Sequence, residues 1–223
     1  MKALPQLAQL ELFIIGESYA GASVPALASR IHQKQRSTMG LLVQSTSSKK
    51  RQFINLKGIG LGNAQVSQEL QWRGWYETGC LGSTPLFNST VCKIVQAAEP
   101  GCEKMMSLCG AFNSNKELCD TVLGYCRSTS VAFLGEAGLN PYDFRKKCDL
   151  NATGCYKQID WLTEYLNSTE VKEGLGIDEG STFQPLDMDL YARFEKSGEM
   201  YKTSLPYVSQ LLSYVSNLFH QTK

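Results

Sequence analysis

Residues 10–21 read LELFIIGESYAG, an apolar run that ends abruptly in a segment of small residues around Ser18. The run predicts a buried strand, and a helix is expected to begin just after the serine. A serine at such a turn fits the nucleophile elbow, which lifts a serine hydroxyl above a parallel sheet. Gly16 and Ala20 flank it because the turn brings backbone segments together where larger side chains would clash. The stretch therefore predicts an α/β protein with Ser18 as its candidate nucleophile.

Downstream of Ser18 the sequence predicts a βαβ unit. Apolar residues recur at helical spacing as far as Ile31, a polar loop is expected at residues 44–51, and a second buried strand at 53–61 ends at Gly62 and Asn63. Two such strands joined by a helix should cross over right-handed into a parallel sheet. The glycines of the second strand do not predict a dinucleotide loop, because their spacing is G-x-G-x-G and they lie within the strand.

The chain contains two histidines, His32 and His220. His32 lies near the expected end of the helix that follows Ser18. A serine at the end of a strand points away from the far end of its own following helix, so we expect a solvated surface histidine at 32 rather than a base for Ser18. No role is assigned to His220.

Charge and hydropathy exclude several classes of partner. The 22 basic and 21 acidic residues almost balance, so nothing indicates binding to nucleic acid or to an anionic membrane. No apolar run approaches the length of a membrane span. We therefore expect no nucleic-acid partner and no membrane partner.

All eight cysteines lie between Cys80 and Cys155, which favours a disulfide-stapled segment in an oxidising compartment. Zinc is the alternative, but no C-x2-C pair occurs, so no metal is expected. Three glycosylation sequons, at Asn88, Asn151 and Asn167, agree with secretion. The N-terminal apolar run is the strand that feeds Ser18 rather than a cleavable signal, so we expect the chain to be a piece of a longer protein.

Three regions are expected. Residues 1–66 form the core with the elbow, and residues 67–198 form a helical cap with the cysteine cluster, in which cross-links substitute for a core. Its expected helices, at 91–98 and 116–123, are short. Residues 199–223 carry an amphipathic helix that begins at Ser204 as a plausible N-cap and packs on the sheet.

Four motifs together resemble the serine carboxypeptidase family, whose members are α/β-hydrolase-fold exopeptidases of vacuoles, lysosomes and secreted fluids. They are GESYAG at 16–21, INLKGIGLGN at 54–63, NPYDFRKKC at 140–148 and YLNSTEVKEGLG at 165–176. They occur in the family's order and with family-like spacing, from about residue 8 to the end. The resemblance implies part of an α/β-hydrolase parallel sheet with a helical, disulfide-stapled cap.

The resemblance also implies roles for individual residues. Ser18 corresponds to the nucleophile, and the backbone N–H of Tyr19 to an oxyanion-hole donor. Glu17 corresponds to a glutamate that helps to recognise the terminal carboxylate of the substrate, and two carboxylates meet only if one is protonated, which favours acidic pH. Trp72 and Trp75 correspond to aromatics that line the pocket for the side chain before the scissile bond. Packing within the cap is the equal alternative for both.

Several family residues have no match here. The triad aspartate and histidine, a glycine of the oxyanion segment and the asparagine of the carboxylate site belong to parts of the family sequence that these residues do not match. Ser181 and Thr182 stand where the family has a cysteine. We therefore expect a fragment that is inactive alone. The family's pattern implies four local disulfides, namely Cys80–Cys92, Cys102–Cys126, Cys109–Cys119 and Cys148–Cys155.

The implied activity is that of a serine carboxypeptidase, which releases the last residue from peptide or protein C-termini through an acyl-enzyme and needs no cofactor. A carboxypeptidase-like acyltransferase shares all of these motifs. A catalytically dead binding or protective protein on the same scaffold is the third possibility, against which the retained Ser18 argues. The expected location is the secretory pathway, with a lysosomal, vacuolar or extracellular destination, and no oligomeric state is predicted.

Overall fold

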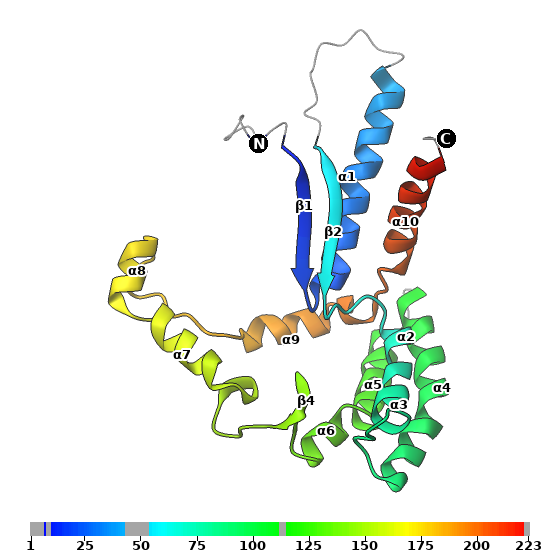
Figure 1. The fold of residues 1–223 in the computed structure, drawn as a ribbon, viewed down its shortest axis with the longest axis vertical. Coiled ribbons are helices and arrows are strands. Elements are labelled where there is room, and N and C mark those ends of the chain that lie inside the picture. Colours follow the sequence, from blue (N-terminus) through cyan, green and yellow to red (C-terminus); the bar gives the residue numbers. More distant parts are fainter. Residues whose placement is uncertain (1–6, 8–9, 43–53, 112–114, 221–223) are drawn as a thin grey trace. The chain divides into compact units, whose positions relative to one another are not determined.

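A computed structural model describes residues 7, 10–42, 54–111 and 115–220 of the chain (Figure 1). The chain divides into two compact units, residues 1–68 with 202–223 and residues 69–201, which we call the core unit and the cap unit. The sequence places the corresponding boundaries at residues 66 and 198. The polar loop predicted at 44–51 lies outside the described residues.

The core unit contains the predicted βαβ unit. Strand β1, Leu12–Glu17, pairs in parallel with β2, Leu56–Gly62, and helix α1, Ala20–Leu42, lies between them in sequence. The parallel pairing confirms the prediction made from the elbow stretch. Two boundaries differ from it, because β2 starts three residues later than expected and α1 continues well beyond Ile31.

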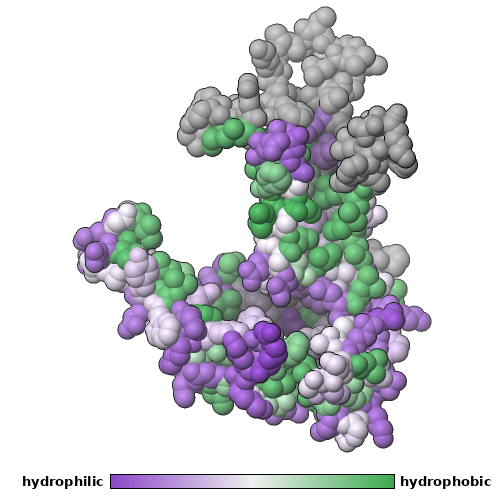
Figure 2. All heavy atoms as spheres, in the orientation of Figure 1, coloured by the Kyte–Doolittle hydropathy of each residue, from purple (hydrophilic) through white to green (hydrophobic). Residues whose placement is uncertain are grey.

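The two faces of the β1–β2 pair differ in exposure. Gly16 of β1 lies close to Val24 of α1, so that face is covered by the helix. Phe13 and Ile15 project from the other face and are 58% and 78% exposed among the described residues, although the sequence predicts a buried strand. Figure 2 shows hydrophobic residues on this face of the core unit.

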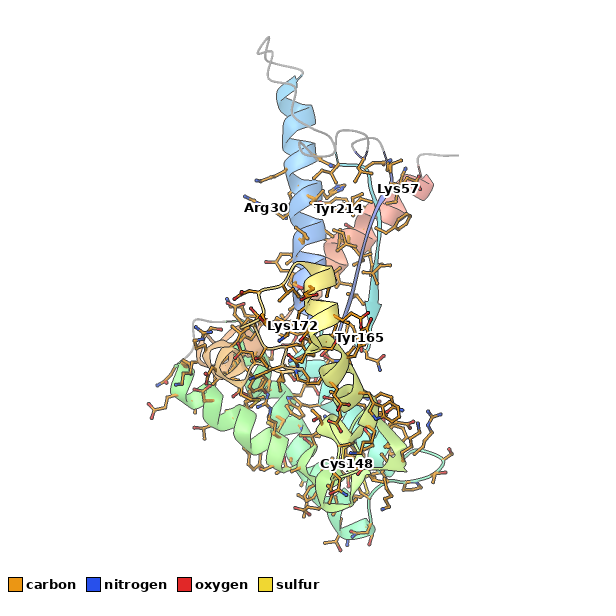
Figure 3. All side chains as sticks on the ribbon, turned by 90° about the vertical axis from the view of Figure 1, so that its left-hand side faces the viewer. Arg30, Lys57, Cys148, Tyr165, Lys172 and Tyr214 are labelled. Atoms are coloured by element: carbon orange, nitrogen blue, oxygen red, sulfur yellow. A yellow bond between two sulfur atoms is a disulfide. The ribbon has the colours of Figure 1, made fainter. Side chains whose placement is uncertain are left out.

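Helix α10, Leu205–His220, packs against α1 rather than on the sheet, which corrects the sequence-based expectation. The Ser29 hydroxyl donates a hydrogen bond to the Gln210 side chain. The rings of His32 and Tyr214 stack with their centroids 3.7 Å apart, and Tyr214 is labelled in Figure 3. Leu212 of this predicted amphipathic helix is exposed. The structure does not describe the side chains of residues 215–220.

Ser204 connects the start of α10 to the elbow region. Its buried hydroxyl lies within hydrogen-bonding distance of the carbonyl oxygens of Gly21, at 2.6 Å, and Val66, at 3.1 Å. Its backbone N–H also donates to Val66 O, at 2.9 Å. Ser204 has the predicted N-cap position, because it directly precedes α10 and its carbonyl accepts the N–H of Val208 at 3.1 Å. Its hydroxyl proton is directed to the carbonyls of Gly21 and Val66. Ser204 therefore holds together the start of α1 and the segment after β2.

We expect Ser204→Ala to lower the free energy of unfolding by about 1–3 kcal/mol, because a buried acceptor loses its donor at a site only 2% exposed. Chemical denaturation monitored by circular dichroism measures the change. Ser209→Ala, on the exposed side of the same helix, is the matched control and should change stability by less than about 0.5 kcal/mol. Equal effects of the two substitutions would contradict the role given to Ser204.

The cap unit is mainly helical. Its elements, with α2 at the boundary, are α2 (Gln68–Gln71), α3 (Arg73–Cys80), α4 (Ser89–Ala111), α5 (Lys116–Ser128), α6 (Ala132–Glu136), β3 (Leu139–Asn140), β4 (Asp143–Lys147), η2 (Thr153–Cys155), α7 (Lys157–Leu166), α8 (Thr169–Leu175), α9 (Met188–Lys196) and η3 (Glu199–Tyr201). Two predictions were wrong here. Helix α4 has 23 residues rather than being short, and β3 and β4 form an antiparallel hairpin where no strands were expected.

The cap also has an apolar core, which the sequence reading underestimated. Phe87, Val95 and Leu134 form its centre, and Trp75 and Tyr76 pack against it. Pro100 lies inside α4 without ending the helix. An amphipathic pattern interrupted by proline and by three cysteines is easily taken for separate short helices, which explains the error.

Four disulfides link the elements of the cap unit, and no described cysteine is free. Cys80–Cys92 joins α3 to α4, Cys102–Cys126 and Cys109–Cys119 join α4 to α5, and Cys148–Cys155 follows the hairpin. These are the four pairs that the family resemblance implies. The nested pairs between α4 and α5 require the two helices to run antiparallel.

An ion pair links α5 to α9 within the cap unit. Arg127 Nη1 lies 2.8 Å from Glu195 Oε1, and Arg127 Nη2 lies 3.5 Å from the Tyr191 hydroxyl. The hydrogen bond from Arg127 lowers the pKa of Glu195 below its usual value. Because the folded-state pKa is lowered, the pair stabilises the cap above the ordinary glutamate pKa, and this contribution is lost as the pH falls.

Candidate functional site

Ser18 occupies a strained turn between β1 and α1. Its φ angle is +57°, in the left-handed region that residues other than glycine rarely adopt. This conformation costs a serine roughly 1–2 kcal/mol. The strand-to-helix context and the left-handed serine together are the geometry of a nucleophile elbow.

Three backbone hydrogen bonds hold the turn. The Ser18 N–H donates to Gly62 O at 3.1 Å, which continues the β1–β2 ladder. The Ser18 carbonyl accepts from the N–H of Gly21 at 3.1 Å and from the N–H of Gln65 at 2.8 Å. The segment after β2 therefore fixes the backbone of the serine, and no sequence pattern had pointed to Gln65.

Close backbone approaches explain the small residues around Ser18. A Cβ atom placed on Gly16 would lie 2.4 Å from the Cβ of Ala20. A Cβ on Gly21 would lie 2.6 Å from the carbonyl oxygen of Gln65, which is backbone and cannot easily move. Alanine is tolerated at position 20 because the residue facing it is glycine, so the departure from G-x-S-x-G does not prevent the turn.

Glu17 and Ser18 lie at the carboxyl ends of the parallel strands, where α/β proteins place their ligands. Glu17, the last residue of β1, is opposite Gly62 in the register, and Glu17 and Ser18 are both exposed. Asn63 follows at the same edge with a φ of +43°. The sequence predicts Asn63 only as the end of a strand. The Gly62-Asn63 pair could have indicated this second left-handed turn, because both residue types are common in turns.

Tyr19 is the single residue between Ser18 and the first residue of α1. Its carbonyl accepts the N–H of Ala22 at 2.9 Å and so belongs to the first turn of the helix. The backbone N–H after an elbow serine is the group expected to stabilise an oxyanion. Tyr19 is the residue that directly follows Ser18.

His32 is not the solvated surface residue that the sequence predicts. Its ring stacks on Tyr214, and its Nε2 atom is buried. His32 lies more than three turns along α1 from Ala20, about 18 Å at 1.5 Å per residue, so its helix carries it away from Ser18. His220 is the last residue of α10, and its side chain lies outside the description.

The two tryptophans belong to the cap unit. Trp72 is 7% exposed and lines a cavity of about 10 Å³ beside the Cys102–Cys126 disulfide. Its buried indole N–H has no hydrogen-bond partner among the described residues. Trp75 is partly buried against the apolar core of the cap. These contacts are those of cap packing, the alternative that the sequence left open for both residues.

Among the described residues, no group of three or more histidine, cysteine, aspartate or glutamate side chains could hold a metal ion. None of the described helices combines the length and hydrophobicity needed to cross a bilayer.

The structure combines a nucleophile elbow, the two parallel strands that support it and a disulfide-linked helical unit. This combination defines the class of protein to which the chain belongs. The sequence matches the serine carboxypeptidase family over residues 1–221, and the chain belongs to that family. It is 30% identical over 203 residues to carboxypeptidase Y homolog A of Coccidioides posadasii, a match that covers 90% of this chain and 34% of that relative. Carboxypeptidase Y homolog A of Aspergillus oryzae is 28% identical, with 98% and 38% covered. The chain thus spans little more than a third of the length of these relatives.

A solved structure shows the same fold. The prohormone-processing carboxypeptidase Kex1Δp from Saccharomyces cerevisiae superposes with a TM-score of 0.60 and 18% sequence identity. The match covers 96% of this chain and 44% of that chain. The predicted fold class, part of an α/β-hydrolase sheet with a helical, disulfide-linked cap, is therefore confirmed.

Proposed function

We propose that these residues form the nucleophile-bearing part of a serine carboxypeptidase that releases C-terminal amino acids from peptides. The observation that carries the proposal is the left-handed backbone of Ser18 at the end of β1. A strained turn at a serine between a strand and a helix is typical of a nucleophile, which gains exposure from it.

In the proposed reaction the Ser18 hydroxyl attacks the carbonyl carbon of the last peptide bond as a general base accepts its proton. The C-terminal amino acid leaves with a proton on its amine, and water then hydrolyses the acyl-enzyme. The N–H of Tyr19 stabilises the negative oxygen of each tetrahedral intermediate. His32 cannot be the base, because it lies far along α1 and stacks on Tyr214.

Glu17 is the proposed contact for the substrate's terminal carboxylate. It is exposed at the end of β1, next to the nucleophile. Two carboxylates attract each other only when they share a proton, so binding should strengthen as the pH falls. Trp72 and Trp75 remain proposed pocket residues for the side chain before the scissile bond. Trp75 is the better candidate of the two, because it is only partly buried within the cap whereas Trp72 is buried.

The proposed route is the secretory pathway, with a lysosomal, vacuolar or extracellular destination. The four disulfides of the cap unit support it, because such cross-links persist in oxidising compartments.

The test uses a complete enzyme. In this protein, residues 1–223 are joined to the segments of a serine carboxypeptidase that they do not match. An N-blocked dipeptide acid should be cleaved faster at pH 4 than at pH 7, and faster than its C-terminal amide. Glu17→Gln should remove most of this pH dependence, because an amide N–H can bind a carboxylate without a shared proton. Glu11→Gln, a glutamate just before the other end of β1, is the control.

Two results would contradict the proposal. The first is release of amino acid at the same rate from the acid and the amide, which would mean that the terminal carboxylate is not recognised. The second is transfer of the acyl group to an added alcohol with no free acid formed, which would identify an acyltransferase.

A further inference from the structure

The three glycosylation sequons place their acceptor amides in different settings. Asn88 is exposed, and its Oδ1 accepts hydrogen bonds from the N–H groups of Thr90 and Val91, both at 3.0 Å. It thus caps the start of α4 with its oxygen alone. Its Nδ2, the atom that would carry a sugar, makes no hydrogen bond to a described residue, so a glycan there leaves the cap intact.

Asn151 is also exposed, and only its backbone takes part in local structure. Its N–H donates to Asp149 Oδ1 at 3.0 Å, and its carbonyl accepts from Lys157 Nζ at 3.1 Å. The side-chain amide makes no hydrogen bond within the described part of the chain. A sugar on this nitrogen would project into solvent.

Asn167 differs from both, because all of its amide groups are engaged. Its Nδ2 donates to Thr163 O at 2.8 Å and to Phe183 O at 2.9 Å, and its Oδ1 accepts the N–H of Phe183 at 2.8 Å. The side chain therefore pairs with both backbone groups of Phe183, as a neighbouring strand would. The Phe183 N–H must donate to an acceptor, so the Asn167 side-chain atom that faces it is the oxygen and the other is the nitrogen.

This pairing holds a segment that has no helix or strand of its own. Residues 177–187 connect α8 to α9, and Asn167 directly follows the last residue of α7. Figure 3 labels Tyr165 of α7 and Lys172 of α8. Lys172 Nζ makes a further contact with Glu179 O, at 3.3 Å. Asn167 anchors the middle of this segment to α7. Among the described residues, no disulfide and no pair of strands holds residues 177–187.

A glycan on Asn167 would remove one of these bonds. N-glycosylation replaces one hydrogen of Nδ2, and the resulting secondary amide is trans, which puts the sugar carbon on the same side as Oδ1. That is the side facing Phe183, whose carbonyl lies 2.9 Å from Nδ2. The sugar would therefore displace the backbone that Asn167 holds.

We propose that Asn88 and Asn151 accept N-linked glycans, and that Asn167 stays unmodified as a structural clamp on residues 177–187. The inference rests on the proposed passage through the secretory pathway. In the transfer, a bond forms between Asn Nδ2 and the sugar C1, the bond from C1 to the phosphate of a lipid-linked oligosaccharide diphosphate breaks, and Nδ2 loses a proton.

The test expresses the protein behind a secretion signal in a eukaryotic host, and maps glycans by enzymatic deglycosylation in heavy-oxygen water. Asn88 and Asn151 should acquire the label, and Asn167 should not. Asn167→Asp should lower the Tm by about 3–8 °C, because a carboxylate then faces two carbonyl oxygens. Thr169→Ala destroys the same sequon but leaves the Asn167 amide in place, so it should leave the Tm unchanged and lower the mass only by the difference between threonine and alanine, with no glycan lost.

Three outcomes would overturn the inference. They are a glycan on Asn167 of the folded, secreted protein, no glycan on Asn88 or Asn151, and equal Tm values for Asn167→Asp and Thr169→Ala. None of them depends on catalysis. A protein glycosylated at Asn88 and Asn151 that releases no amino acid would contradict the proposed function and leave this inference standing.

Discussion

Ser18→Ala in the complete enzyme is expected to abolish labelling by an organophosphate inhibitor and to lower kcat by a factor on the order of 10⁶. The reason is that Ser18 is the proposed nucleophile, and without its hydroxyl no acyl-enzyme forms. Mass spectrometry of the intact protein measures the labelling, and release of amino acid from an N-blocked dipeptide measures turnover.

Two further variants separate loss of chemistry from loss of structure. Ser23→Ala removes an exposed hydroxyl one turn into α1 and should leave labelling unchanged. Ser18→Gly should be as inactive as Ser18→Ala yet more stable, by about 1 kcal/mol, because glycine adopts a φ of +57° without strain. Labelling that persists in Ser18→Ala would mean that the nucleophile has been misassigned.

The elbow could be predicted from sequence because its determinants are local. A strand, a serine and small residues at positions 16, 20 and 21 lie within one short stretch, and the close approach of Gly16 to Ala20 follows from the turn itself. The parallel strand pair was predictable for a similar reason, since β1, α1 and β2 follow one another in the chain.

The groups that support the elbow from a distance could not be predicted. Gln65 holds Ser18 through its backbone N–H, which carries no sequence signal. Ser204 was predicted correctly as the residue that precedes α10, but the tertiary contact of its hydroxyl with the Gly21 and Val66 carbonyls carries no sequence signal. Periodicity shows that α10 has an apolar face but not which element covers it, and here that element is α1.

His32 shows how far local reasoning reaches. The sequence excluded it as a base by its distance along the helix, and the structure supports that exclusion. Its surroundings were predicted wrongly, because the stacking partner Tyr214 lies on α10, far away in sequence. Asn167 is a similar case, since a sequon describes three consecutive residues and its partner Phe183 lies 16 residues on.

The second large effect concerns residues 1–223 expressed by themselves, which we expect to show no carboxypeptidase activity. A serine hydroxyl is a weak nucleophile until a neighbouring base accepts its proton, and loss of the histidine from a serine-protease triad costs a factor on the order of 10⁶. Of the two histidines in this sequence, His32 is carried away from Ser18 by α1 and stacks on Tyr214. The exposed Phe13 and Ile15 should also reduce solubility.

The measurement compares residues 1–223 with a full-length relative on an N-blocked dipeptide between about pH 4 and pH 7. Because a low rate can come from a trace of contaminating protease, Ser18→Ala and His32→Ala of the same chain are assayed beside it. All three proteins should give the same background. Turnover within a factor of about 100 of the relative, lost in Ser18→Ala, would show that a base is present after all. Its further loss in His32→Ala would identify that base as His32, and an unchanged rate there would leave His220 as the only other histidine able to serve.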